Sequence, residues 1–227
     1  GAYRWPKVGF TAVPFNGGAM EHATAISYPL FAIDGTLNYE TLWAHELSHH
    51  WWGDLVTCRT AEDMWLNEGM ASYSEALFLE HLYGYDAYMN ETRNNHKDVL
   101  LNAHRNDGGR FPVSGIPSAI TYGDHVYNKG ATVAHSLRGY MGDSLFFYSV
   151  KTYLAQNNYK DVSSTDFRDA LSTASGVNLT DFFNDWVFHP GWPHFSIDSI
   201  QVVPVGATYN VSVFVKQKLL DAPAFYN

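Results

Sequence analysis

His45-Glu46-Leu47-Ser48-His49 is the stretch that decides how this 227-residue sequence is interpreted. On a helix His45 and His49 are separated by about 400°, so both imidazole rings project from one face, roughly 6 Å apart, and can bind a single ion. Glu46 lies beside them and can activate a water molecule. The pattern predicts a helical metal site, and a pair of solvated or core-satisfied histidines is the alternative that these five residues alone leave open.

A second stretch, Trp65-Leu66-Asn67-Glu68-Gly69, supplies a third ligand. Eighteen residues separate Glu68 from His49, enough for a helix-loop-helix connection to bring the carboxylate to the histidine pair. Two histidines, one carboxylate and an open fourth position are the ligand set of a catalytic zinc site. Zinc lowers the pKa of a bound water to about 7, and Glu46 is then expected to act as the general base. We therefore predict one Zn²⁺ ion bound by His45, His49 and Glu68.

Three further polar residues lie near these ligands in the sequence. Glu75 follows Glu68 by two helical turns, so it is expected either to orient a ligand through a hydrogen bond or to face solvent. Asp54 is a second candidate for the orienting role. His50 points about 100° away from His49 on a helix, and we expect it not to bind metal.

The composition favours a globular protein with one substantial core, since 46% of the residues are hydrophobic. Asp and Glu outnumber Lys and Arg by 23 to 14, and the resulting formal charge of -9 argues against nucleic acid as a partner. Cys58 is the single cysteine, so an internal disulfide is excluded. The sequence contains no apolar run of about 18 residues and no signal-peptide pattern, so we expect a soluble chain and predict no compartment.

Secondary structure is predicted from hydrophobic periodicity and from start and stop signals. Strand-like composition over Val8 to Phe15 and Met20 to Tyr28 predicts a small N-terminal sheet. The helix that carries the histidines is expected from Tyr39 to Trp52, with Asn38 as its N-cap. Residues 105–120 are expected to form a loop. The remaining predicted helices cover about 61–83, 85–103, 123–141, 143–156, 164–175 and 180–188.

The residue pattern changes after His189-Pro190-Gly191-Trp192-Pro193. Apolar and polar residues alternate over 195–203 and 209–215, as is typical of strands. Two strands cannot form a stable sheet alone. We therefore expect residues 1–192 to form the main domain and residues 193–227 to be the opening strands of an incomplete β domain. The predicted fold class is α+β, mainly helical, with a small N-terminal sheet.

Four ordered motifs resemble the aminopeptidase N family of zinc exopeptidases, the gluzincins. Gly18-Ala19-Met20-Glu21-His22 is similar to the family's exopeptidase signature Gly-Ala/Gly-Met-Glu-Asn, with His22 in place of the usual Asn. The stretch from His45 to Gly53 is similar to its HExxH-x-Trp-aromatic-Gly motif, and Asp54 follows where Asn is common. Residues 65–69 repeat Trp-Leu-Asn-Glu-Gly, and residues 126–130 resemble Tyr-x-Lys-Gly. The resemblance covers most of residues 13–195 and implies a thermolysin-like zinc peptidase domain.

The resemblance assigns roles to residues outside the ligand set. It implies that Tyr127 donates a hydrogen bond to the tetrahedral oxyanion and that Glu21 binds the α-amine of the substrate. The second role has a physical basis, because a peptide α-amine has a pKa of about 8 and is mostly ammonium near neutral pH. Gly18, Ala19 and Met20 are expected to form the adjoining substrate-binding edge, where the backbone of a peptide can approach closely.

The function implied by the resemblance is a metallo-aminopeptidase that acts on peptides with a free N-terminus. Family members usually carry flanking domains, so the resemblance also implies that this chain is an excised catalytic domain. An endopeptidase and an epoxide hydrolase on the same metal centre are the enzymatic alternatives. A non-catalytic scaffold is the alternative from another class, and the presence of all the expected chemical groups argues against it. The preferred side chain at the first residue of the substrate is not predicted.

Overall fold

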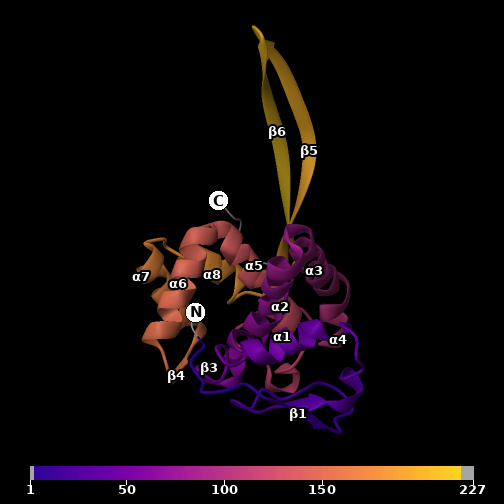
Figure 1. Cartoon of the computed structure of the whole chain (residues 1–227). Coiled ribbons are helices and arrows are strands. Elements are labelled where there is room, and N and C mark those ends of the chain that lie inside the picture. Colours follow the sequence, from indigo (N-terminus) through magenta and orange to yellow (C-terminus); the bar gives the residue numbers. More distant parts are fainter. Residues whose placement is uncertain (1–2, 221–227) are drawn as a thin grey trace.

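A helical body carries a small sheet at one end and a long β-hairpin at the other (Figure 1). This computed structural model describes residues 3–220, without the side chains of residues 193, 194, 219 and 220. Helices dominate the body and the sheets are small, which confirms the predicted α+β class. Across the described residues, none of the helices combines the length and the apolar character that crossing a membrane requires.

The helical elements differ in type and length, and the strands are short except for the last two. The α-helices are α1 (Glu40–Ser48), α2 (Glu68–Tyr83), α3 (Tyr85–Asp98), α4 (His104–Asn106), α5 (Gly130–Met141), α6 (Asp143–Gln156), α7 (Ser164–Ser175) and α8 (Thr180–Trp186). The 3-10 turns are η1 (Leu30–Ala32), η2 (Ala61–Leu66) and η4 (Ser118–Ile120), and the π-helical turns are η3 (Val99–Ala103) and η5 (His125–Lys129). The strands are β1 (Phe10–Val13), β2 (Ile26–Pro29), β3 (Val56–Cys58), β4 (Lys160–Val162), β5 (Trp192–Val205) and β6 (Thr208–Leu220).

The helix that carries the histidines is shorter than predicted, and the predicted N-cap is wrong. The cap position of α1 is Tyr39, which makes no side-chain capping hydrogen bond. Asn38 instead belongs to a turn in which its backbone N–H donates to Thr36 Oγ1 at 3.1 Å, while the Thr36 hydroxyl donates to Asp34 Oδ1 at 2.7 Å. Short polar side chains compete with helix formation by binding nearby backbone groups in this way. Asn38 therefore stays in the turn, and the helix begins after Tyr39.

Two predicted helices contain π-helical turns that periodicity did not reveal. The helix expected over 85–103 is α3 followed by η3, and the helix expected over 123–141 is η5 followed by α5. Turns of π-helix are rare and frequently lie at functional sites. Both turns also contact each other, which places their irregular backbones side by side.

The two small sheets of the body are both parallel pairs. β1 pairs with β2 from Phe10↔Ile26 to Val13↔Pro29, so the strand predicted from Met20 to Tyr28 is only partly correct. Met20 forms an isolated antiparallel bridge with Ser27 instead of continuing that strand. β3 pairs with β4 across about a hundred residues of sequence, and the sequence pattern did not predict this pair.

The main core lies where α2 packs on α1 and α5 and where α6 packs on α7. Trp65 in η2 is fully buried, and its indole Nε1–H donates to Ser164 Oγ at 2.8 Å. Its ring meets Phe167 edge-on with a centroid distance of 5.9 Å, and Phe167 meets Tyr153 at 4.7 Å. These contacts hold the start of α2, where Glu68 lies, against α6 and α7.

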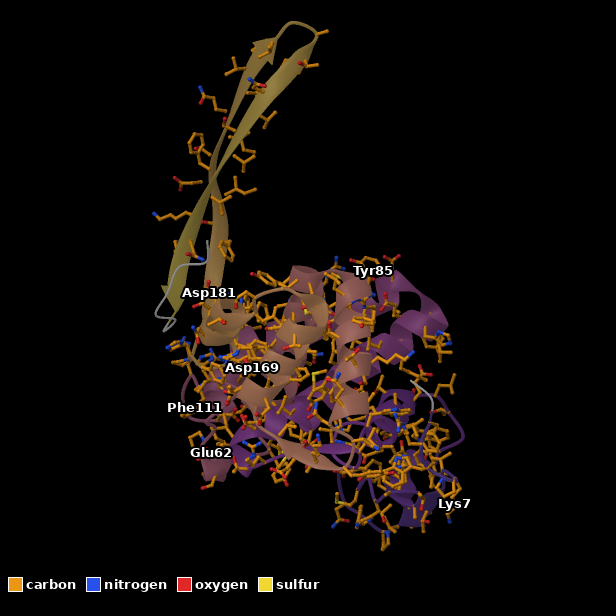
Figure 2. All side chains as sticks on the ribbon, turned by 90° about the vertical axis from the view of Figure 1, so that its left-hand side faces the viewer. Lys7, Glu62, Tyr85, Phe111, Asp169 and Asp181 are labelled. Atoms are coloured by element: carbon orange, nitrogen blue, oxygen red, sulfur yellow. The ribbon has the colours of Figure 1, made fainter. Side chains whose placement is uncertain are left out.

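The hairpin of β5 and β6 projects away from the body, with its side chains extending outward along both strands (Figures 1 and 2). A bulge between Ile197 and Ser199 keeps large apolar residues together on one face. The exposed cross-strand pairs of this face are Ile197–Val215, Ile200–Val213 and Val202–Val211. Both predicted strands lie within β5 and β6. The predicted domain boundary after residue 192 stays a prediction.

Candidate metal centre and active site

The three predicted ligands converge on one point. His45 lies in the last turn of α1, His49 is the residue that follows α1, and Glu68 is the first residue of α2. His45 Nε2 and His49 Nε2 each lie 3.2 Å from the same carboxylate oxygen, Glu68 Oε2. One potential ligand atom from each residue lies within 4.8 Å of the others, and all three residues are buried. The helical spacing and the packing of α1 on α2 therefore create the cluster together.

The spacing of these atoms fits a tetrahedral zinc ion. Zinc binds imidazole nitrogens and carboxylate oxygens at about 2.0 to 2.2 Å, so two ligands of a tetrahedral site are about 3.3 Å apart. The two nitrogen-to-oxygen distances of 3.2 Å match that separation. The donor set of two imidazoles and one carboxylate is also the set found in catalytic zinc sites. The residues present therefore fit this metal.

Both histidines have their second ring nitrogen held by another group. His45 Nδ1 donates to Glu75 Oε1 at 2.8 Å, and His49 Nδ1 donates to the carbonyl oxygen of Trp52 at 2.8 Å. A hydrogen bond at Nδ1 fixes the ring orientation and leaves Nε2 as the free ligand atom. Glu75 thus occupies the orienting position that its spacing from Glu68 allows.

Glu46 is 4% exposed and lies on the same helix as His45. Burial raises the pKa of its carboxyl group to about 7, with the charges of Glu21 and Glu68 adding to the rise and the two histidines opposing it. Its Oε2 atom is buried and has no hydrogen-bond partner among the described residues. A buried carboxylate oxygen requires a partner, and a water molecule between Glu46 and a metal ion would supply one.

A cavity of about 430 Å³ opens over the cluster. Its walls come from the strand-like segment before β2, from α1 and α2, and from the π-helical turn η5. The lining residues are Gly18, Ala19, Glu21, Thr41, Leu42, His45, Glu46, His49, Glu68, Ser72, Glu75, Asp124, Tyr127 and Asn128. Most of the predicted site residues therefore share one cavity.

Tyr127 reaches this cavity from the π-helical turn η5. Its ring stacks on the His45 ring with a centroid distance of 6.0 Å and an interplanar angle of 18°. Burial raises the pKa of the Tyr127 hydroxyl well above its ordinary value, and the charge of Glu68 raises it further. The hydroxyl therefore keeps its proton and serves as a hydrogen-bond donor.

Glu21 lies at the strand edge that lines the same cavity. Its Oε1 atom is 3.9 Å from His49 Nδ1. Met20 exchanges both backbone hydrogen bonds with Ser27, at 2.9 and 2.8 Å. Because backbone groups of successive residues in an extended segment point to opposite sides, those of Ala19 and Glu21 point away from Ser27.

Met20 is the one predicted substrate-binding residue that does not line the cavity. Side chains alternate along an extended segment, so Met20 points to the opposite side from Ala19 and Glu21 and is 39% exposed. Gly18 adopts a φ of 64°, in the left-handed region that favours glycine, and thereby turns the chain into this edge.

Two glycines set the separation between Glu68, the third predicted ligand, and Tyr127. A β-carbon on Gly69 would lie 2.8 Å from Gly130 Cα, and one on Gly130 would lie 2.8 Å from Gly69 Cα. A larger residue at either position would push the start of α2 away from the start of α5. The Trp-Leu-Asn-Glu-Gly and Tyr-x-Lys-Gly motifs therefore meet through their terminal glycines.

His50 and Asp54 lie beside the cluster and contact each other. His50 Nε2 is 3.7 Å from Asp54 Oδ2, and His50 Nδ1 is 2.7 Å from the hydroxyl of Tyr3. Burial raises the pKa of Asp54 to about 6, and the nearby charge of Glu21 adds to the rise. The ligand cluster found among the described residues is His45, His49 and Glu68, and the expectation that His50 does not bind metal stays a prediction.

Several cavity residues were missed by sequence reasoning. Thr41 and Leu42 lie one turn before His45, and Ser72 lies one turn after Glu68, so helical spacing contained the signal for these three. Asp124 and Asn128 flank Tyr127 on an irregular turn, where no regular spacing predicts which residues face the cavity.

Comparison with known proteins gives one family. The model described as Peptidase family M1 domain matches residues 1–186. Leucyl aminopeptidase of Saccharolobus solfataricus is 30% identical over 206 residues, which cover 84% of this chain and 26% of that protein. Aminopeptidase N of Lactococcus lactis subsp. cremoris is 30% identical over 210 residues, which cover 84% of this chain and 24% of that protein. The chain spans about a quarter of the length of these curated relatives.

Solved structures share the fold. An M1 zinc metallopeptidase of Deinococcus radiodurans, bound to a Tyr-Ser-Ala substrate, has 25% identity and a TM-score of 0.69, covering 80% of this chain and 39% of that chain. Native leukotriene A4 hydrolase of Saccharomyces cerevisiae has a TM-score of 0.73 at 19% identity, covering 84% of this chain and 32% of that chain. At that lower identity the likeness extends to the fold alone.

Proposed function

The chain belongs to peptidase family M1, and from this premise we propose that it is the catalytic part of a zinc-dependent aminopeptidase. The reaction is hydrolysis of the N-terminal bond of a peptide that has a free α-amine. One observation carries the proposal: the Nε2 atoms of His45 and His49 both lie 3.2 Å from Glu68 Oε2, in a cavity that Glu46 and Glu21 also line.

His45, His49 and Glu68 are the residues that would hold the zinc ion. The bound ion would polarise the scissile carbonyl group and lower the pKa of a water molecule to about 7. The hydrogen bonds from the two Nδ1 atoms to Glu75 and to the Trp52 carbonyl support this assignment, because they keep both Nε2 atoms directed at the ligand position.

Glu46 is the general base. Its unpartnered Oε2 atom takes a proton from water as the water oxygen bonds to the carbonyl carbon. The same carboxyl group then gives the proton to the leaving nitrogen as the carbon–nitrogen bond breaks. A single residue thus moves one proton across the whole reaction.

Two other residues hold the substrate and its transition state. Glu21 pairs with the α-ammonium group, and the backbone of Gly18 and Ala19 lies along the substrate main chain. Tyr127 donates its hydroxyl proton in a hydrogen bond to the oxyanion that forms at the carbonyl. A carboxylate at a set distance from the metal makes the site select the first peptide bond.

The organisation of the complete protein is part of the proposal. We place the catalytic domain at residues 1–192 and the opening strands of a β domain at 193–227, and the exposed apolar face of the hairpin supports this division. Domains beyond this chain, as the resemblance implies, stay a prediction. The full-length protein is therefore the right material for every assay of activity.

Replacing Glu46 with Gln tests the mechanism. The substitution keeps the shape of the side chain and removes the base, so turnover should fall by about 10²- to 10⁴-fold while elemental analysis still finds one zinc ion. Glu62→Gln, at an exposed position on the body, is the matched control and should behave as the parent (Figure 2). Full activity of the Glu46 variant would show that the mechanism is wrong.

Free and N-acetylated peptides of one sequence separate the alternatives. An aminopeptidase cleaves the free peptide and spares the acetylated one, whereas an endopeptidase on the same metal centre cleaves both. Equal cleavage would therefore reject the role proposed for Glu21. The relatives from Saccharolobus and Lactococcus are named aminopeptidases, which favours peptides over epoxides as substrates. A full-length protein that binds no zinc would instead support the non-catalytic scaffold.

A further inference from the structure

A buried lysine lies two residues after Tyr127 in the Tyr-x-Lys-Gly motif. Lys129 is 2% exposed, and burial lowers the pKa of its amino group to about 7. Its Nζ atom donates a hydrogen bond to the carbonyl oxygen of Phe111 at 2.8 Å. Removing an amino group from water is costly, so an apolar side chain of similar length would fill this position at lower cost. The presence of a lysine calls for a role beyond packing.

A buried histidine lies two residues before Tyr127 and binds the same residue. His125 Nε2 accepts the backbone N–H of Phe111 at 3.1 Å, and the two rings meet edge-on at 5.6 Å. Both backbone polar groups of Phe111 are therefore bound by residues that flank Tyr127 in the sequence. Phe111 itself lies at the edge of the body, on the side where Glu62 lies (Figure 2).

Asp107 connects the same loop to the beginning of the turn. Its carboxylate accepts the backbone N–H groups of Asp124 at 3.2 Å and His125 at 2.9 Å, and it pairs with His125 Nδ1 at 2.6 Å. A β-carbon on Gly123 would lie 2.4 Å from Asp107 Oδ1, so glycine is needed for this approach. The segment 107–111 thus holds η5 at both of its ends.

The geometry of η5 relates these anchors to Tyr127. Residues two positions before and two positions after a helical residue lie on the opposite side of the turn. Tyr127 accordingly faces the cavity and His45, while His125 and Lys129 bind the loop behind it. The turn η5 runs directly into α5 at Gly130, so α5 and the segment 107–111 together hold it.

We propose that Lys129, together with His125, is a positioning residue that holds the hydroxyl of Tyr127 in the cavity through the backbone of Phe111. The inference rests on the proposed function, since it concerns the group assigned to the oxyanion. Lys129 is neither a member of the ligand cluster nor one of the residues that line the cavity, so its effect would pass through Tyr127. A displacement of about 1 Å at a catalytic group can lower the rate about 10²-fold.

A double-mutant cycle tests this proposal in the full-length protein. Lys129→Met should lower kcat by about 10- to 100-fold with KM and zinc content unchanged. Tyr127→Phe should lower kcat by about 10²- to 10³-fold. The double variant should have the kcat of Tyr127→Phe alone, because Lys129 has nothing left to position. Lys97→Met, at an exposed position of α3, is the control and should change nothing.

The outcomes separate the failure of this inference from failure of the proposed function. The positioning role would be overturned if the kcat losses of the two single variants multiplied in the double variant. An unchanged kcat in Lys129→Met would overturn it too. Either result would leave the proposed function intact. Full activity of Tyr127→Phe would instead reject the oxyanion role and the inference with it. Circular dichroism and zinc content show whether Lys129→Met folds. If it does not, the cycle is run with His125→Phe, which removes the acceptor of the Phe111 N–H. The kcat of that double variant should again equal the kcat of Tyr127→Phe alone.

Discussion

The two sides of the cavity are held by different kinds of contact. On one side, His45, His49 and Glu68 come from adjoining ends of α1 and α2, two helices that pack directly on each other. On the other side, Glu21 lies on an edge held by the Met20–Ser27 bridge, and Tyr127 lies on a turn held by residues 107–111. The predicted metal centre therefore depends on short-range helical geometry, whereas the groups proposed to bind the substrate and its transition state depend on several separate contacts.

Removal of Glu68, one of the proposed metal ligands, should have the largest effect on turnover. Glu68→Ala leaves two imidazoles without the carboxylate that both approach, so the variant should lose zinc and with it all measurable turnover. Elemental analysis and a peptide assay measure the two losses together. Chelation of the parent should produce the same state, and added zinc should restore activity. If zinc-free protein kept full turnover, the assignment of His45, His49 and Glu68 as ligands of a catalytic zinc ion would be wrong.

Removal of the Tyr127 hydroxyl should have the next largest effect and should leave the metal in place. Tyr127→Phe keeps the ring that stacks on His45 and loses about 2.7 to 4 kcal/mol of transition-state stabilisation, so kcat should fall by about 10²- to 10³-fold. Tyr140→Phe on α5 is the matched control, since Tyr140 is 57% exposed. A loss of zinc in Tyr127→Phe would mean that the two sides of the cavity are not independent.

Neutralising Glu21 should have a smaller effect that depends on the substrate. A hydrogen bond to a charged group contributes about 1.5 to 3 kcal/mol, so Glu21→Gln should lower kcat/KM for free peptides by about 10- to 100-fold. Residual cleavage of acetylated peptides should stay unchanged, because these substrates have no ammonium group to bind. Steady-state kinetics on the matched pair of peptides measures both values. An equal loss on both peptides would assign Glu21 to the chemistry instead of to recognition of the amine.

Removal of the Glu75 carboxylate should have the smallest effect on turnover. Glu75→Ala frees His45 Nδ1, and loss of such an orienting partner typically lowers metal affinity by about 10- to 100-fold. Competition with a zinc chelator measures this change. At saturating zinc, turnover should approach that of the parent, since the ligands and Glu46 remain. Unchanged zinc affinity would show that the Trp52 contact to His49 and the packing of α1 suffice to orient the ligands.

The regular elements were the most predictable part of the fold. The helices α6 and α7 agree with the predicted ranges and the two predicted strands lie within the hairpin, because amphipathic periodicity is a local property of the sequence. The helix predicted over about 61–83 is correct only for α2, since residues 61–66 form the 3-10 turn η2. The parallel pair β3 and β4 could not be predicted, since strands of three residues have almost no pattern and pair across about a hundred residues. The prediction of Asn38 as the N-cap of α1 was wrong because the Thr36 hydroxyl oxygen accepts the backbone N–H of Asn38 and holds this residue in a turn before the helix.

The same division holds within the site. Helical spacing puts His45 and His49 on one face, and the sequence motifs single out Glu68, Glu21 and Tyr127, which line the same cavity. Neither spacing nor motifs predicted that Met20 turns away from the cavity. That outcome depends on which neighbour the extended segment pairs with, and the partner is Ser27.

The sequence alone specifies the α+β class and the chemical groups of the candidate site: two imidazoles one helical turn apart, a carboxylate beside them and a second carboxylate at the start of another helix. Tertiary packing determines where these groups lie relative to Tyr127 and Glu21. The contact of Gly69 with Gly130 and the hydrogen bonds of Phe111 join segments far apart along the chain. Local periodicity specifies which side chains share a face, but distances between faces result from packing.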